Sequence, residues 1–382
     1  MGRGIDFNDP RPLYEQIEID IKEKISRGEI TPGHQIGSQS DLVKEYNVSL
    51  ITVKKALSNL VADGTLFTRQ GVGTFVAEAV FRKVDLSAHK TIGVVLRDLK
   101  HPFFSLIIHS IEERTSELGY NFLLSSSSNS LEKEEAQINR FRELNVDGII
   151  IASLSMEYRA SDFIQKLHHE KFPYLMVSYI HDPDYWYVGA DHEYGGFIAA
   201  EHLIKLGYKN IGYLHAGRGN LLSEVRKNGY YRALNEYNIN FDSNLVYYLN
   251  EENYDQYGDR FKQGLEFGKK FLQFKERPDA LFVYSDLVAL GFSQAVTEGG
   301  MKIPDDIAIV GYDDIQVSSF ASIPLTTIHQ PADKIGRLAV DILQKRIENR
   351  DIGNRTILKP ALIVRESCGA KKRIISKKSM TG

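Results

Sequence analysis

Two sets of polar side chains in this sequence have the types and the spacing that ligand binding needs. Between residues 38 and 74, hydroxyl, amide and cationic side chains alternate with apolar ones. Between residues 97 and 330, hydroxyls, carboxylates and an arginine follow the ends of short apolar segments, close to aromatic residues. Such groups bind polar ligands by hydrogen bonds, and aromatic faces add stacking surface. The elements that hold each set decide what it would bind.

Three helices and a hairpin are predicted to hold the first set. Apolar residues recur over 13–25 at the spacing of one helix face, and Gly28 follows where that helix would end. A second helix is predicted after the capping box of residues 38–41, and a third over 49–64. Strand-like segments within 66–77 flank a glycine-rich turn. This order predicts a winged helix-turn-helix.

The first turn of the third helix would enter the major groove of DNA, with the hairpin tip as a second contact. Hydroxyl and lysine side chains bond base edges and phosphates, apolar ones meet a thymine methyl group, and glycines allow close approach. The alternative is a motif that contacts only protein, with Leu50 and Ile51 as a sticky patch. The predicted DNA-binding residues are Ser38, Gln39, Ser49, Leu50, Thr52, Lys54, Lys55, Arg69, Gln70, Gly71, Gly73 and Thr74.

From residue 91 onward, short apolar segments alternate with amphipathic stretches such as 103–118 and 131–144. This alternation predicts an α/β fold with doubly wound parallel sheets and crossover helices. Nearly 280 residues are many for one such sheet, so we expect two lobes. The predicted strands are 91–96, 121–124, 147–152, 174–177, 210–214, 245–248, 280–284 and 307–310.

Ligands of open parallel sheets bind beyond the carboxyl ends of the strands. The side chains there suit a polyol, because carboxylates accept from sugar hydroxyls, an arginine donates and a ring stacks on the sugar face. Arg97, Asp98, Tyr179 and Asp314 stand at the same strand ends. The predicted effector-binding residues are His101, Phe103, Phe104, Ser127, Ser153, Ser178, Arg226, Ser285, Asp286, Asp313 and Gln330.

Each of these residues also has a simpler interpretation. Asp286 and Asp313 could cap the helices that follow them, and Arg226 could pair with Glu224. Phe103 and Phe104 could belong to the core. The set favours a ligand site because so many of its members recur at one edge of the sheet.

Composition bounds these interpretations. The 382 residues are 42% hydrophobic and 25% charged, which is typical of two or three globular domains. The single cysteine, Cys368, cannot form an internal disulfide, and a net charge of −3 argues against coating nucleic acid along the whole chain. No secretory signal or membrane-spanning stretch is present, so we expect a cytoplasmic protein without membrane contact.

The N-terminal residues resemble the GntR family of regulators. The similarity lies in 13–14, 28–33, 48–57 and 71–76, which cover the family pattern from Leu13-Tyr14 to Gly71-Val-Gly-Thr-Phe-Val76. The resemblance implies operator DNA as a partner. Four departures mean that the operator sequence of relatives cannot be carried over: Gly37, Gln39, Leu50 and Lys54.

The remainder resembles the LacI/GalR family of sensors, whose domain is similar to the two-lobed periplasmic sugar-binding proteins. The similarity is carried by 91–95, 191–196, 202–207, 285–291, 304–307, 311–314 and 324–330. It implies sugar contacts by Arg226, Asp313 and Gln330. Ser285 and Leu222 stand where the family often has asparagine and a hydroxyl residue, so the particular sugar is not implied.

We therefore predict a ligand-responsive repressor of carbohydrate-use genes, without a cofactor, metal or catalytic site, that binds operator DNA as a homodimer and is released by a small sugar. A GntR-type head on a LacI-type body resembles the arabinose-repressor family in layout, which implies a pentose. The predicted domains are a head (1–77), a linker (78–90), a sensor (91–370) and a basic tail (371–382) that is solvated or, alternatively, contacts DNA. The lobes are about 91–190 with 331–359, and about 191–330 with 360–368.

Other classes of function stay open: a sugar-binding protein, an enzyme, or a DNA-binding scaffold that senses nothing. An enzyme could use Asp313-Asp314 as a carboxylate pair or His168-His169 as a metal or base site. Adjacent residues rarely converge, however, and no nucleophile–base constellation or phosphate loop is present.

Overall fold

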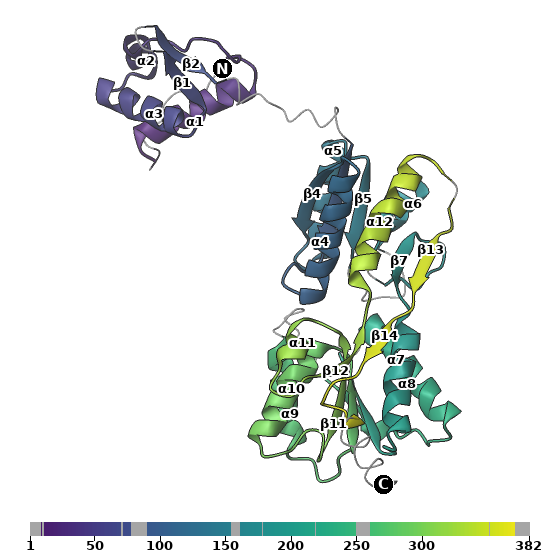
Figure 1. The fold of residues 1–382 in the computed structure, drawn as a ribbon. Coiled ribbons are helices and arrows are strands. Elements are labelled where there is room, and N and C mark those ends of the chain that lie inside the picture. The colour runs from purple at the N-terminus through teal and green to yellow at the C-terminus, as the bar shows by residue number, and fades with distance from the viewer. Residues whose placement is uncertain are drawn as a thin grey trace. The chain divides into compact units, whose positions relative to one another are not determined.

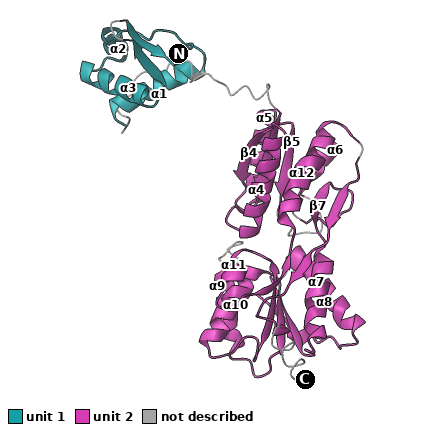
Figure 2. Cartoon of the chain, in the orientation of Figure 1, with its two compact units in different colours: residues 1–88 teal, residues 89–382 magenta. Residues whose placement is uncertain are grey.

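The computed structural model describes residues 9, 11–69, 72–77, 90–153, 161–177, 179–217, 219–249, 260–350 and 352–370. The chain divides into two compact units, residues 1–88 and 89–382 (Figure 2). The predicted tail and, apart from Lys90, the predicted linker lie outside the described residues. So do three predicted site residues: Gln70, Gly71 and Ser178.

The first unit, called the head below, is a winged helix-turn-helix (Figure 1). Ser38 and Asp41 form the predicted capping box at the second helix, which ends at the left-handed Asn47. The Ser49 side chain accepts from the Thr52 N–H and caps the third helix. The elements are α1 (Leu13–Ser26), α2 (Gln39–Tyr46), α3 (Leu50–Ala62), β1 (Leu66–Arg69) and β2 (Gly73–Val76).

The core of the head explains why these helices pack. Ile17, Ile21 and Ile25 of the predicted apolar stripe of α1 are buried, and they pack in one core with α3, where Val53 and Leu60 are fully covered. The strands β1 and β2 pair antiparallel. Residues 33–36 extend this hairpin, because Ile36 donates to the Thr74 carbonyl and Val76 to that of His34.

The second unit, called the sensor, contains two six-stranded sheets. The order in the first is β13-β7-β6-β5-β3-β4, and all of its pairs are parallel. The first-sheet strands are β3 (Thr91–Leu96), β4 (Asn121–Ser126), β5 (Gly148–Ala152), β6 (Tyr174–Met176), β7 (Tyr187–Ala190) and β13 (Arg355–Leu358).

The second sheet has the order β14-β12-β11-β10-β8-β9, and only its edge strand β14 is antiparallel to its neighbour. All eight predicted strands occur in the two sheets, whereas β7, β12, β13 and β14 were not predicted. The second-sheet strands are β8 (Ile211–His215), β9 (Val246–Tyr248), β10 (Ala280–Val283), β11 (Ala308–Asp313), β12 (Thr326–His329) and β14 (Ala361–Ile363).

Helices cover both faces of each sheet (Figure 1). In the first sheet, Val94 packs in the cluster beneath α4 and α12, while its neighbour Val95 packs in the cluster on the opposite face. Consecutive strand residues therefore serve two cores, as the doubly wound prediction requires. The sensor helices are α4 (Pro102–Glu117), α5 (Leu131–Glu143), α6 (Asp162–His169), α7 (His192–Lys205), α8 (Leu221–Glu236), α9 (Arg260–Phe271), α10 (Asp286–Glu298), α11 (Val317–Phe320) and α12 (Ala332–Ile347).

The two lobes of the sensor are joined by chain crossings. The chain leaves the first sheet after β7 and enters α7, which packs on the second. It returns after β12 through α12, which packs on α4 and β5, and crosses again between β13 and β14. Among the described helices, none combines the length and the apolar character that crossing a membrane needs.

Candidate functional site

The first two turns of α3, with the cap residue Ser49, carry five of the twelve residues that were predicted to contact DNA. Leu50 is 44% exposed and Ile51 is 80% exposed, and the side chains of Lys54 and Lys55 are exposed on the same helix. The hydroxyls of Ser49 and Thr52 lie 2.8 Å apart at the first turn. The helix thus offers cationic, hydroxyl and apolar groups to a partner, while its other face fills the core.

The hairpin beside α3 is held in a defined shape. The Arg69 guanidinium stacks over the rings of Phe67 and Phe75, at 5.4 Å from each centroid. Gly73 has a φ of 147°, and a Cβ there would lie 2.3 Å from the amide nitrogen of Gln35. Only glycine fits this position, so the predicted tip depends on it. Thr74 follows within β2 and is half-buried.

Ser38 and Gln39 begin α2 and are exposed. The Ser38 hydroxyl caps α2, since it accepts from the Asp41 N–H and donates to the Asp41 carboxylate. Gln39 has no such bond among those found in the described residues, and its side chain is open to a partner.

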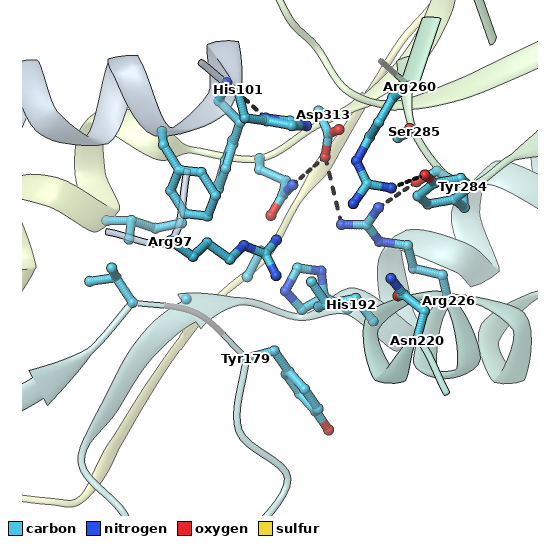
Figure 3. A pocket seen from close by; sticks show the side chains of 18 of the residues that line it. Arg97, His101, Tyr179, His192, Asn220, Arg226, Arg260, Tyr284, Ser285 and Asp313 are labelled. Atoms are coloured by element: carbon cyan, nitrogen blue, oxygen red, sulfur yellow. Dashed lines mark hydrogen bonds and ion pairs between the residues drawn. The ribbon is translucent and has the colours of Figure 1, made fainter. Parts of the chain in front are cut away.

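A cavity of about 670 Å³, partly open to solvent, lies between the carboxyl ends of the two sheets of the sensor. This volume includes space that is open to solvent. Figure 3 shows side chains from both lobes pointing into it. It brings together seven of the predicted effector-binding residues: His101, Phe103, Phe104, Arg226, Ser285, Asp313 and Gln330.

Arg226 and Asp313 form the buried centre of this cavity. Arg226 is 4% exposed, and its guanidinium lies 3.6 Å from the Tyr312 ring centroid and 3.6 Å from Asp313 Oδ1. Its Nη1 donates to the Tyr284 carbonyl. Arg226 therefore does not use Glu224, which bonds His215 and Lys227 instead.

Asp313 has an unusual backbone as well as a buried carboxyl. Its φ is 117°, a region that residues with a Cβ rarely occupy and that often marks functional sites. Its Oδ1 accepts from Gln330 Nε2 at 2.7 Å. Burial raises the pKa of Asp313 to about 6, while Arg226 opposes that rise. Asp313 caps no helix among those described, so the simpler interpretation is wrong for it.

Three residues that line the cavity have a buried polar atom without a hydrogen-bond partner among the described residues. The atoms are Arg226 Nε and the hydroxyls of Tyr187 and Ser285. An unpaired buried donor costs about 1–3 kcal/mol. A polar ligand that reached one of these atoms would recover part of that free energy.

His101 contributes a neutral donor. Its Nδ1 accepts the Phe103 N–H at 3.3 Å as the cap of α4, which leaves the ring proton on Nε2. Burial, helped by the charges of Arg260, Arg97 and Arg226, lowers the pKa of His101 to about 3.

Several cavity residues were missed by the sequence prediction of the site. Arg97 and Tyr179 stand at strand ends and carried a signal that could have placed them in the set. Asn220 caps α8 and Arg260 opens α9, so neither follows a predicted strand directly. His192 lies at the crossing into α7, after a strand that was not predicted.

Two of the predicted serines lie elsewhere. Ser153 donates to Glu134 Oε1 at 2.7 Å, and Ser127 is fully buried, but neither lines the cavity. Burial raises the pKa of Glu134 to about 7. Strand-end position was correct for both serines, but their side chains turn into the lobe.

Asp286 also lies outside the cavity lining and is fully buried. Its carboxylate accepts from the Thr327 and Ser318 hydroxyls, at 2.5 and 2.7 Å, and from the Ile315 N–H at 3.1 Å. A Cβ on Gly311 would lie 2.2 Å from Asp286 Oδ1, so glycine makes room for the carboxyl. Asp286 thus ties α10 to β12 and α11. Burial, with the nearby charge of Asp313, raises its pKa to about 8.

The residue pairs that an enzyme could have used do not converge. Asp313 turns to the cavity, whereas Asp314 turns away and pairs with Arg365 at 2.6 Å and His329 at 3.0 Å. His168 bonds the Tyr174 hydroxyl at 2.8 Å. No group of three or more metal-ligating side chains occurs among the described residues.

Fold and cavity together define a two-lobed ligand-binding domain in one chain with a winged helix-turn-helix. Comparison with protein families agrees with each part. Residues 13–76 match the bacterial regulatory proteins of the gntR family, and residues 200–368 match the periplasmic binding protein-like domain.

Relatives match over almost the whole chain. The arabinose metabolism transcriptional repressor of Geobacillus stearothermophilus is 31% identical, over 93% of this chain and 97% of its own length. The transcriptional repressor PurR of Mannheimia succiniciproducens is 30% identical, over 86% of this chain and 97% of its own. The chain therefore belongs to the bacterial transcriptional repressors with a ligand-sensing domain of the periplasmic-binding-protein type, and its head is of the GntR type.

Solved structures of regulators share the sensor fold. CcpA of Lactococcus lactis has a TM-score of 0.65 at 27% identity, covering 73% of this chain and 99% of its own. A LacI-family regulator from Enterococcus faecium with bound ribose has a TM-score of 0.62 at 26% identity, covering 73% and 98%.

Proposed function

We propose that this repressor binds operator DNA through α3 and the hairpin, and that a small carbohydrate in the sensor cavity changes its affinity for that DNA. The observation that carries the proposal is the buried Arg226–Asp313 pair at a cavity between two lobes, in a chain that also carries an exposed recognition-type helix. A two-lobed domain can couple ligand binding to a change of shape.

In the DNA-bound form we infer a homodimer in which each head contacts one half-site of a near-palindromic operator. Lys54, Lys55 and Arg69 would contact phosphates or guanine edges, and Thr52 and Leu50 would contact bases. This assignment is supported by burial, since Leu50, Lys54, Lys55 and Arg69 are exposed and Thr52 is half-buried.

In the sensor we infer that Arg226 donates to the ligand and that Asp313 and Gln330 exchange hydrogen bonds with its hydroxyls. Phe103 and the neutral His101 would pack beside the sugar ring. A pentose is the first candidate, because relatives include an arabinose repressor and a regulator with bound ribose. A coupling free energy of about 1–3 kcal/mol would change operator affinity about 5–150-fold.

We further infer that the chain regulates and does not catalyse, and that it acts in the cytoplasm, where operator DNA is. The divergence of Asp313 from Asp314 supports the absence of a carboxylate-pair reaction.

The test is a two-step DNA experiment with the full chain. Duplexes selected from a random library should share a near-palindromic site, and their binding should weaken steeply as salt rises. Adding L-arabinose or D-ribose should then release the selected duplex. No enrichment, or binding that salt leaves unchanged, would contradict the DNA part. Binding unaffected by every monosaccharide tried would contradict the carbohydrate part.

A further inference from the structure

Three guanidinium groups converge on the sensor cavity. Arg97 comes from the end of β3 in one lobe, and Arg226 and Arg260 come from α8 and α9 in the other. Figure 3 shows all three pointing toward the same space. Their charges act together on both His101 and Asp313, so the convergence is electrostatic as well as geometric.

Among the described residues that line the cavity, Asp313 is the single carboxylate. It already accepts from Gln330 and faces Arg226. The described wall therefore carries more positive than negative groups.

Three helices add to this positive field. The N-terminal ends of α4, α8 and α10 lie at the cavity, where His101, Asn220 and Ser285 are the cap residues and also lining residues. A helix N-terminus carries about half a positive charge and favours anions. The Ser285 hydroxyl and Arg226 Nε, which have no partner among the described residues, give buried donors to such a group.

We propose that the natural effector is an anionic sugar, in which a phosphate or carboxylate lies between Arg97 and Arg260 while the hydroxyls face Arg226, Asp313 and Gln330. This inference rests on the proposed function of the cavity as the effector site, and it names the chemical class of the effector. Arginine suits the anion because its planar fork bonds a phosphate or carboxylate through two N–H groups.

The experiment compares matched neutral and anionic sugars by thermal shift and calorimetry on the full chain. The pairs are D-ribose, D-arabinose and D-glucose, each with its terminal phosphate ester, together with D-gluconate; inorganic phosphate serves as a control. At least one anionic sugar should bind tenfold or more tightly than its neutral counterpart, which is about 1.4 kcal/mol. Inorganic phosphate alone should bind weakly.

The outcomes separate this inference from the proposed function. Neutral sugars that bind as tightly as every anionic counterpart would overturn the anionic effector and leave a carbohydrate sensor in place. No binding of any sugar, neutral or charged, would overturn both. A phosphate ester that binds while gluconate does not would identify phosphate as the recognised group.

Variants then locate the anion. Arg260→Gln and Arg97→Gln should each lower the affinity for the preferred anionic sugar at least tenfold, with little change for the neutral sugar. Lys269→Gln removes an exposed positive charge from the same helix as Arg260 and should leave both affinities unchanged. Retained DNA binding by each variant shows that it folds. Unchanged affinity for the anion in both arginine variants would overturn the proposal.

Discussion

The head and the sensor cavity use charged side chains in opposite ways. On α3, Lys54 and Lys55 are exposed to solvent, and neighbouring Ile51 is 80% exposed. In the cavity, Arg226 and Asp313 are only 4% and 6% exposed, and each is held by fixed partners. One region keeps its groups in water until a partner arrives, whereas the other has already removed them from water.

This difference predicts two kinds of binding. Exposed cations gain affinity for DNA mainly by releasing counterions, so each contributes modestly and salt screens the effect. Buried groups in fixed positions give specificity, because a ligand that fails to match them leaves charges unpaired. Substitutions in the cavity should therefore have larger and more selective effects than those on α3.

The largest effect is expected for Arg226→Ala. It removes the central cavity donor and leaves Asp313 buried without its cation, so the affinity for any effector should fall at least a hundredfold while DNA binding persists. Arg226→Lys, which keeps the charge without the planar fork, should recover only part of the response. Calorimetry and thermal shift measure both.

Arg232→Ala is the matched control, since Arg232 lies on α8 but pairs with Glu193 at 2.6 Å and does not line the cavity. A normal ligand response in Arg226→Ala would show that this buried cation does not contribute to effector binding. The expected difference between the buried charges of the cavity and the exposed charges of the head would then be absent.

Local periodicity was enough to predict the head. Its helix stripes, the capping box at Ser38 and the glycine-rich turn are all signals between near neighbours in sequence. In the sensor, eight strands were predicted from apolar segments, and these include the three-residue strands β6 and β9. The four-residue strands β7 and β12 gave no separate signal. The edge strands β13 and β14, of four and three residues, are partly exposed and were not predicted either.

The cavity could be predicted only in part, because side-chain direction depends on distant residues. Asp286 stands at a strand end like Asp313, yet its carboxyl lies in the core. The Thr327 hydroxyl donates a hydrogen bond to it there, and the missing side chain of Gly311 leaves room for it. Arg260 reaches the cavity from the start of a helix, where a strand-end rule does not apply.

The next largest effect is expected when Lys54 and Lys55 are both changed to alanine. DNA affinity should fall about ten- to a hundredfold at low salt, and the slope of log affinity against log salt should become shallower by about 2, since each phosphate contact contributes about 0.9. Fluorescence anisotropy with a selected duplex at several salt concentrations measures both quantities.

The control removes the two exposed lysines of α9, Lys269 and Lys270, and should leave the salt slope unchanged. A double α3 variant with the parental slope would show that these lysines do not contact phosphates, and the head would then resemble the cavity in depending on specific contacts.

A smaller effect is expected for Gly73→Ala. The new Cβ would meet the Gln35 amide and would hold a φ of 147° that alanine rarely adopts. The head should lose about 1–3 kcal/mol of stability and part of its DNA affinity, while effector binding stays unchanged. Gly28→Ala tests a positive φ without a steric contact, because Gly28 has a φ of 73° and open space around its Cα. Equal losses in the two variants would mean that the Gln35 contact is unimportant.

The smallest effect concerns pH and belongs to the sensor core. Burial raises the pKa of Asp286 from 3.8 to about 8, so the folded chain holds a proton that the unfolded chain has lost. The resulting stability is fully present below pH 3.8 and disappears as the pH rises through about 8. Between pH 7 and 9, the melting temperature of the sensor should therefore fall by about 2–5 °C.

Asp286→Asn should remove most of that fall, since an amide imitates the protonated acid and cannot ionise. A small part should remain, because burial raises the pKa of Glu134 to about 7. The comparison is made above pH 7 because burial lowers the pKa of His101, which removes stability only as the pH falls below about 6.5. Asp313, with a pKa raised to about 6, has also lost most of its proton by then. Melting curves of both chains that decline in parallel from pH 7 to 9 would show that Asp286 is already ionised in the fold. Its three donors, Thr327, Ser318 and the Ile315 N–H, would then outweigh its burial, and the buried groups near the cavity would behave more like the solvated charges of the head.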